Sequence, residues 1–472
     1  MASTHSSFLV FISVLALTFT SCSPSKNLNI ERGTGYNFRP GFPEFYSSAF
    51  GYVDNENGPT LNITAEVVKG SLIYKREGDS LSANFAVDLQ IQDVSNPEHI
   101  LASKRIEKEV TSVDESTLST RETVSLDYSM QVDPSRYRVV VNVTDLNSDK
   151  NLTQTVEAYI PNVKTGAYTL TGIQMYGKVN GQKWNKISTY DVKGKVDSLR
   201  FVFQVISERT DEPMTINSKL VRIKSDTTYP RPLHFSNYSP SSVEYKGINF
   251  DETKEIQSTQ RVLTDYSSIF IEYKFPQQER GNYKFEVTAT KGNKEGIYKA
   301  RTFGVKSANY PSLGTARELA RPLVYLMGEG DHEELMKISN PDSLKKAIDR
   351  FWLKNIGSAA KAKEVVELYY QRVVEANKQF SNFKEGWKTD LGMIYILFGP
   401  PWYAEDHLKE LVWYFSYNHA DPEYRFRFYQ PKLNNRYFPF YHYLLERHNY
   451  YYTVQYLQRQ LWLSGQILTR RI

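Results

Sequence analysis

Apolar and polar residues alternate along two parts of the chain with the period of a half-buried β-strand. Residues 81–91 are apolar at every odd position, and residues 124–132 alternate in the same way. A polar turn over 133–136 then leads into predicted strands over 137–143 and 152–160. Strict alternation places one face of a strand on a core and the other face in solvent. This part of the chain is therefore expected to form an antiparallel β-domain.

The same succession of strands and turns recurs 146 residues later, over 269–275, 283–289 and 297–305. In each copy a tyrosine, Tyr137 or Tyr283, opens the penultimate strand after a turn that contains Pro or Gly. This arrangement resembles the tyrosine corner of immunoglobulin-like and fibronectin type III sandwiches, in which the hydroxyl bonds to the upstream backbone. We expect two duplicated β-sandwiches, over 34–164 and 165–307, the second with a longer excursion over 219–260. No catalytic pattern falls within them, so we interpret them as spacers or binding modules.

From Ser312 the apolar residues follow the period of a helix. A first apolar helix is expected over 316–327. Asn340 and Pro341 are good N-cap and N1 residues for a second helix over 342–355. Gly357 and Ser358 separate it from a third helix over 359–380, which has an apolar stripe at three- and four-residue steps. We interpret these helices as packing elements without chemistry of their own.

The most specific pattern in the chain follows the third helix. Its members, in order, are Gly386, Trp387, Lys388, Thr389, Asp390, Leu391, Gly392, an apolar run over 393–398, Gly399, Pro400, Pro401, Trp402 and a strand over 410–415. This succession resembles the GWxTD domain of bacterial envelope proteins, which is named for the residues standing here at 386–390. The resemblance covers about 310–472 and implies an α+β domain over 308–472, but the family has no assigned activity. Leu391 stands where we expect Arg in the family, so any pairing of that Arg with the motif is absent here.

In physical terms the motif is expected to form a corner of the backbone. Gly386 allows close approach or a positive φ, and Trp387 buries a large ring while its indole N–H stays bonded. Thr389 and Asp390 are expected to bond nearby backbone amides. On this interpretation, replacing Asp390 by Asn costs about 1 kcal/mol, the net value of one hydrogen bond. Gly392 is expected to lead into a buried strand over 393–398, ended by the Gly-Pro-Pro turn.

The alternative to a corner is a catalytic site. Asp390 would then act as a general base or a ligand together with Glu405, Asp406 or His407. We assign no catalytic residue and no cofactor. The histidines at 407, 419, 442 and 448 show no helical spacing of three or four residues, so we assign no metal site either.

The C-terminal region is unusually aromatic, with 22 aromatic residues over 395–462. We consider six of them candidates for binding: Trp402, Trp413, Tyr441, Tyr450, Tyr451 and Tyr452. Tyr and Trp combine a large rigid area with a polar tip, which suits a protein partner or a stacked glycan. The same residues would suit a membrane interface, or a small core filled with aromatic rings.

The N-terminus indicates a location. Residues 8–19 form an apolar run that is too short to span a bilayer and has the length of a signal-peptide core. Cys22, the only cysteine, follows it in a sequence that resembles a bacterial lipobox in which Phe19 replaces the usual Leu. The resemblance implies a signal peptide over 1–21, a lipidated Cys22 and a tether over 22–33. No acidic cluster of the kind found in surface-exported lipoproteins of the Bacteroidota follows, which favours the periplasmic face of the outer membrane.

Charge and cysteine content exclude several classes of protein. The chain has 58 Lys plus Arg against 53 Asp plus Glu, and no basic run concentrates the net charge of +5, so nucleic acid is not an expected partner. A single cysteine excludes a disulfide framework, a thiolate zinc site and an iron–sulfur cluster.

Together these observations predict a lipid-anchored outer-membrane protein, of Bacteroidota type, with two immunoglobulin/fibronectin-like β-sandwiches before an α+β domain. We favour a scaffold or adaptor that binds a protein partner through its aromatic C-terminal domain, over an enzyme. The alternatives are a glycan- or peptidoglycan-binding lipoprotein and a hydrolase with a site near Asp390.

Overall fold

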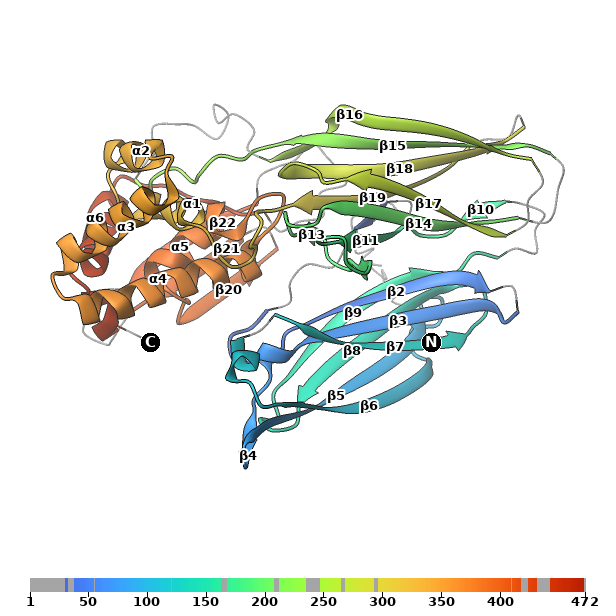
Figure 1. Cartoon of the computed structure of the whole chain (residues 1–472), viewed down its shortest axis with the longest axis horizontal. Helices are drawn as coiled ribbons and strands as arrows, with labels where there is room; N and C mark the ends of the chain where they lie inside the picture. Colours follow the sequence, from blue (N-terminus) through green and yellow to red (C-terminus); the bar gives the residue numbers. More distant parts are fainter. Residues whose placement is uncertain are drawn as a thin grey trace, which may run out of the picture.

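In the computed structural model of the chain, two β-sandwiches are followed by a C-terminal domain of helices and a small sheet (Figure 1). This arrangement confirms the predicted fold class. The structure describes residues 30–32, 38–54, 56–119, 121–162, 168–207, 212–234, 247–264, 268–292, 296–408, 410–416, 423–430 and 442–470. Cys22 and the predicted signal peptide lie outside these residues. None of the helices in the described part is both long and apolar enough to cross a membrane.

The first sandwich contains eight strands among the described residues. They are β2 (Phe45–Asp54), β3 (Gly58–Val68), β4 (Lys75–Glu77), β5 (Ser80–Asp93), β6 (Ile100–Ser112), β7 (Thr123–Gln131), β8 (Arg136–Asp145) and β9 (Asn151–Tyr159). One sheet has the order β2-β3-β7, and in the other β5 pairs with β4, β6 and β8, and β8 pairs with β9. The alternation predicted for 81–91 is present in β5, whose Phe85 and Val87 are fully buried.

The second sandwich continues the chain. Its strands are β10 (Thr169–Leu170), β11 (Gln174–Lys178), β12 (Asn185–Lys186), β13 (Asp191–Val192), β14 (Ser198–Ile206), β15 (Met214–Ser225), β16 (Ile248–Leu263), β17 (Ile269–Pro276), β18 (Gly281–Lys291) and β19 (Ile297–Val305). One sheet runs β16-β15-β18-β19, with β13 also on β19, and the other joins β10, β11 and β17 to β14, and β12 to β11. Strand β1 (Ile30–Arg32) also pairs with β19, in parallel. Residues 30–32, predicted to belong to a tether, are therefore part of this sheet, because β19 offers them a free edge.

The two sandwiches repeat one topology. The order β6-β5-β8-β9 of the first corresponds to β16-β15-β18-β19 of the second, and β2-β3-β7 corresponds to β11-β14-β17. Both tyrosine corners are present: the Tyr137 hydroxyl donates to the carbonyl of Asp133 at 2.7 Å, and that of Tyr283 donates to Glu279 at 2.8 Å. The matching order and the matching corners agree with the predicted duplication.

One connection differs between the two copies. Residues 94–99 join β5 to β6 by a short turn, whereas residues 226–247 join β15 to β16. Residues 226–234 of this longer connection leave the sandwich and reach the C-terminal domain (Figure 1). We call these residues the strap. Leu233 of the strap is fully buried in the C-terminal core.

The C-terminal domain combines helices with a four-stranded sheet of order β20-β21-β22-β23. The helices are α1 (Ala316–Ala320), α2 (Glu329–Lys337), α3 (Pro341–Ile356), α4 (Ala359–Phe380), α5 (Asp390–Phe398) and α6 (Tyr451–Leu463), and the strands are β20 (Tyr403–His407), β21 (Glu410–Phe415), β22 (Tyr424–Tyr429) and β23 (Leu444–Leu445). The predicted caps are confirmed: Asn340 caps α3, Gly357 ends it in the left-handed conformation, and Ser358 caps α4.

The strand predicted over 393–398 is wrong, because these residues belong to helix α5. All nine residues of α5 are buried, so no polar face reveals a helical period. A short apolar run of this kind does not distinguish a buried strand from a buried helix. The helix forms because Thr389 caps its N-terminus and Gly399 ends it.

The first sandwich contacts both other modules through buried polar groups. The side-chain amide of Gln204, which is 1% exposed, exchanges two hydrogen bonds with the backbone of Val53, at 2.7 and 2.9 Å. Glu44 binds Arg121 of its own sandwich at 2.6 Å and Lys378 of α4 at 3.0 Å. Burial alone would raise the pKa of Glu44. The two cations outweigh burial and hold that pKa below its ordinary value, so the carboxylate stays charged.

Candidate functional site

The two glycines of the predicted corner lie where backbone segments cross. A Cβ on Gly386 would stand 1.9 Å from the carbonyl oxygen of Ala376 in α4, and a Cβ on Gly392 would stand 2.0 Å from that of Gly386. Both obstacles are backbone atoms, which cannot move aside as a side chain can. Close approach, rather than a positive φ, therefore requires glycine at these two positions.

Trp387 and Thr389 hold the turn between α4 and α5. The Trp387 ring is 2% exposed, and its indole N–H donates to Glu385 at 3.0 Å. The Tyr325 hydroxyl donates to the carbonyl of Trp387. The Thr389 hydroxyl donates to the carbonyl of Gly386 at 2.7 Å and accepts the amide of Gly392 at 3.0 Å, so it caps α5.

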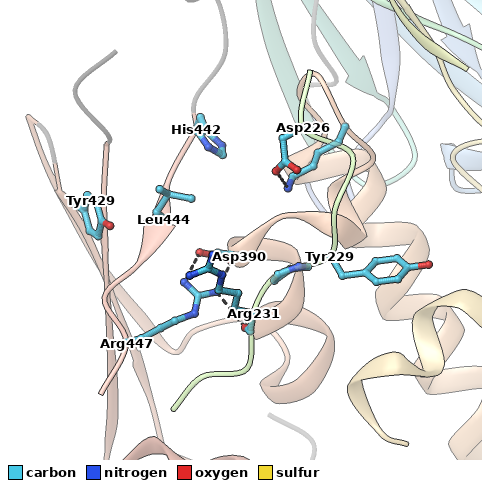
Figure 2. Close-up of a pocket in the computed structure, with 10 residues that line it drawn as sticks. Asp226, Tyr229, Arg231, Asp390, Tyr429, His442, Leu444 and Arg447 are labelled. Atoms are coloured by element: carbon cyan, nitrogen blue, oxygen red, sulfur yellow. Dashed lines mark hydrogen bonds and ion pairs between the residues drawn. The ribbon is translucent and has the colours of Figure 1, made fainter. Parts of the chain in front are cut away.

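Asp390, in the first turn of α5, has its carboxylate bound by three donors. Arg447 donates from Nη2 to Oδ1 at 2.8 Å and from Nη1 to Oδ2 at 3.0 Å, and the amide of Leu445 in β23 donates to Oδ2 at 2.7 Å (Figure 2). The side chains of Asp390 and Arg447 are both only 5% exposed. Burial raises the pKa of Asp390, but the charge and hydrogen bonds of Arg447 outweigh it and hold that pKa below its ordinary value.

Arg447 also binds the strap. Its Nη2 donates to the carbonyl of Arg231 and its Nε to that of Pro232, both at 3.1 Å. Figure 2 shows the strap passing directly beside the Asp390–Arg447 pair. Leu391, which replaces the Arg expected there, is buried in the core. The motif's aspartate therefore has an arginine partner after all, and this partner lies 57 residues further along the chain.

The residues directly before the motif bind the second sandwich. Glu385, which is 4% exposed, accepts the amide of Ser307 at 3.0 Å and the guanidinium of Arg280 at 2.5 Å. Lys384 donates to Asp226 of the strap at 2.8 Å. Burial alone would raise the pKa of Glu385. The charges of Lys388 and then Arg280 outweigh burial and hold that pKa below its ordinary value, so the carboxylate stays charged.

A second group of buried contacts lies beside these. Lys306, at the end of the second sandwich, donates to the carbonyl of Asn382 at 2.6 Å and lies 3.2 Å from Asp191. Asn282 of β18 donates to the carbonyl of Phe383 at 2.8 Å. Residues 382–390 thus contribute to a buried polar interface between the second sandwich, the strap and the C-terminal domain. We call this interface the joint.

The joint contains no catalytic cleft among the described residues. The cavity beside Asp390 has a volume of about 30 Å³, room for about one water molecule, whereas ligand sites usually measure at least about 300 Å³. Glu405 and His407 lie on β20, at the opposite edge of the sheet from β23, about 14 Å away at three strand spacings. The predicted catalytic group is not brought together. In the described ranges, no cluster of three His, Cys, Asp or Glu could hold a metal ion.

The aromatic candidates separate into two groups. Trp413 and Tyr451 are 5% and 2% exposed and belong to the core, so neither can contact a partner. Trp402, Tyr450 and Tyr452 are 53%, 60% and 61% exposed. Tyr441 lies outside the described residues.

Gly399, Pro400 and Pro401 end α5, and Gly399 has a φ of +90°.

Part of the exposed surface of α6 was not predicted from the sequence. Tyr456 and Leu457 of α6 are 54% and 48% exposed. Tyr456 lies one helical turn from Tyr452, and we call the surface that these two residues share the tyrosine face. A helical period over 451–463 would have revealed it, because Tyr451, Val454, Gln458 and Trp462 form the buried side of α6.

Comparison with known proteins agrees with the motif. Residues 281–464 match the family model described as the GWxTD domain. This chain contains a GWxTD domain. The match begins in β18, so the matched region includes the last two strands of the second sandwich as well as the joint. No protein among those of curated function matches the sequence.

Solved structures show only distant likeness. Red sea bream transglutaminase is 9% identical with a TM-score of 0.19, over 56% of this chain and 31% of that one. A Salmonella alpha-2-macroglobulin is 14% identical with a TM-score of 0.20, over 58% and 17%. The serine-rich repeat protein Srr2 of Streptococcus agalactiae is 8% identical with a TM-score of 0.21, over 55% and 92%. The chain spans less than a third of the first two, and scores this low support no inference.

Proposed function

We propose that the protein is a non-catalytic scaffold of the bacterial envelope, anchored to the outer membrane through a lipid on Cys22. In this role the joint holds the second sandwich and the C-terminal domain as one rigid body, and the tyrosine face binds a protein partner. The observation that carries the proposal is that the polar groups of the motif make structural contacts within the protein. The polar groups of Glu385, Thr389 and Asp390 are all engaged in hydrogen bonds within the chain, and among the described residues no cleft of ligand size opens beside them.

The tyrosine face supports a protein partner. Tyr452 and Tyr456 lie four residues apart and therefore on one side of α6, opposite the buried side. Tyrosines are enriched where protein interfaces bind most strongly, because each offers a large area at a small cost in conformational entropy.

Site-specific photo-crosslinking in envelopes tests the partner surface. A photoreactive phenylalanine at Tyr452 or Tyr456 should give one discrete protein adduct, whereas the same group at Phe270, which is 54% exposed on the second sandwich, should not. Once the adduct identifies the partner, co-purification without a crosslinker measures how much of it the protein recovers. Tyr452→Ala with Tyr456→Ala should lower that amount by about ten-fold, as expected for two contact residues. If the double variant recovers as much of the partner protein as Phe270→Ala does, the tyrosine face is not the binding surface.

Membrane fractionation tests the anchor separately. Cys22→Ser should move the protein from the membrane fraction to the soluble fraction, because stable attachment needs the several acyl chains of a lipoprotein. A Cys22→Ser protein that still sediments with outer membranes after a salt wash would contradict the proposed anchor.

A further inference from the structure

A groove of about 610 Å³ runs along the outer face of α4. The C-terminal end of α5 and residue Pro40 form its other walls. Its volume lies within the range of about 300–1,000 Å³ that is typical of ligand sites, unlike the cavity beside Asp390. All of the residues that line it are described by the structure.

The wall formed by α4 is acidic. Its members recur at three- and four-residue steps, which places them on one face of the helix: Glu364, Glu367, Leu368, Gln371, Arg372 and Glu375. The twelve residues from Glu364 to Glu375 span about 16 Å, because eleven rises of 1.5 Å separate the first from the last. An extended peptide covers that length with about five residues.

The carboxylates of the groove are only partly neutralised. Glu364 has no ion-pair partner among the described residues, and Glu367 lies 4.0 Å from Lys363, with both side chains more than two thirds exposed. Such exposed pairs contribute little. Arg372 is 6% exposed and directed inward, toward the carbonyls of Ile396 and Leu397 at 3.3 and 3.4 Å. The outer wall therefore keeps an excess of negative charge.

Glu375 is held in a fixed orientation. It accepts the Tyr395 hydroxyl at 2.6 Å and the Gln371 amide at 3.0 Å. Burial raises the pKa of Tyr395, and the adjacent charge of Glu375 raises it further, so the phenol remains a donor. Glu375 is thus a pre-oriented acceptor at one end of the groove, while Glu364 and Glu367 lie at the other end.

The shape of the groove selects its ligand. The two acidic ends lie too far apart to bind one small cation, so the ligand must be elongated and carry several positive charges. Leu368 and Pro400 provide apolar surface between them. Lysine and arginine combine a charged end with an apolar stem, which matches this alternation of carboxylates and apolar walls.

We propose that this groove binds an extended, lysine- or arginine-containing segment of a protein partner. The inference rests on the proposed scaffold function, for which it adds a second contact site made of residues separate from the tyrosine face. The chemistry that recognises the partner is charge complementarity along about five residues.

Fluorescence anisotropy with the full chain tests the groove. The probe is a labelled peptide Lys-Leu-Lys-Ala-Lys, and its matched control is Glu-Leu-Glu-Ala-Glu. The basic peptide should bind, and more weakly as salt rises, because the charges are solvent-exposed. Binding of the acidic peptide with equal affinity, or equal displacement of the basic peptide by spermine at the same concentration of charge, would overturn the proposal.

Substitutions locate the binding. Glu364→Gln with Glu367→Gln and Glu375→Gln should weaken the basic peptide about ten-fold, since three pairs each contribute a factor of about two. The control, Glu333→Gln with Glu334→Gln, changes two exposed carboxylates of α2 and should alter affinity less than two-fold. Glu364→Lys with Glu367→Lys changes exposed side chains only, and should abolish binding even if the triple variant fails to fold. Unchanged affinity in this Lys variant would refute the groove.

The two proposals can fail separately. Loss of crosslinking at Tyr452 with peptide binding intact would remove the tyrosine face and leave the groove. Peptide affinity that is equal in the wild type, the α4 variants and the α2 control would remove the groove and leave the tyrosine face.

Discussion

Replacing Asp390 by Asn removes the charge that balances Arg447 and changes little else. The amide keeps the shape of the carboxylate and one acceptor oxygen. Arg447 remains, with its side chain 5% exposed, and must then hold a positive charge in a buried site without its counter-ion. The perturbation is therefore electrostatic rather than steric.

The structure revises the magnitude expected from sequence. An aspartate that bonds one nearby amide would lose about 1 kcal/mol, but the carboxylate of Asp390 accepts three donors, two of them from a buried guanidinium. Breaking one side of a buried ion pair costs about 3–5 kcal/mol. We expect Asp390→Asn to fall in this range. Asp406→Asn, at an exposed position on β20, should stay within about 0.5 kcal/mol.

Urea unfolding followed by tryptophan fluorescence measures the effect. Five of the six tryptophans lie after residue 350, so the signal reports mainly on the GWxTD domain. A double-mutant cycle with Arg447→Met isolates the pair. The double variant should cost less than the sum of the singles by about 2 kcal/mol, because it leaves no unpaired charge.

The lowered pKa of Asp390 predicts how the stability of the protein depends on pH. The folded pKa of Asp390 lies below its unfolded value of about 3.9, so its stabilisation is complete above that value and is lost as the pH falls through the folded pKa. The gap between wild type and Asp390→Asn should be constant from pH 7 to 5 and shrink below pH 4. A variant as stable as wild type, but inactive in an envelope-integrity assay, would refute the reasoning and support a catalytic Asp390.

Three further predictions concern the same corner. Gly386→Ala and Gly392→Ala should each cost at least about 3 kcal/mol in urea unfolding, because the new Cβ meets backbone, whereas Gly330→Ala in open space on α2 should be neutral or stabilising. Trp387→Ala should cost about 3–5 kcal/mol by the same assay, as large aromatic truncations in cores do. Burial lowers the pKa of Lys388 to about 8, so wild type should gain stability relative to Lys388→Met as the pH rises from 8 toward 10.

Local patterns in the sequence predicted much of the fold. The alternation over 81–91 and the two tyrosine corners led to both sandwiches, and the residues Asn340 and Ser358 marked the starts of two helices. These features depend on neighbours a few residues apart. The failure at α5 has the same origin, because a helix buried on all sides has no polar face to reveal its period.

The contacts that define the candidate site are long-range, and the sequence did not reveal them. Arg447 pairs with Asp390 across 57 residues, and the strap binds α6 through Leu233 and Gln455 across 222 residues. The departure at Leu391 suggested a missing partner, but no local pattern pointed to Arg447. One signal was available in the sequence. Asp390 is followed directly by an apolar run, which indicates burial, and a buried carboxylate needs a cation as partner.

We propose that the joint couples the second sandwich to the C-terminal domain, so that the two open as one unit. Native-state hydrogen exchange on the full chain, in wild type and in Glu385→Gln, measures this coupling directly. The variant weakens the contacts of Glu385 with Ser307 and Arg280. We predict that amides in β18 and in α5 open with the same free energy in wild type, and that the variant lowers both together. Full protection of β18 alongside reduced protection of α5 would contradict the claim.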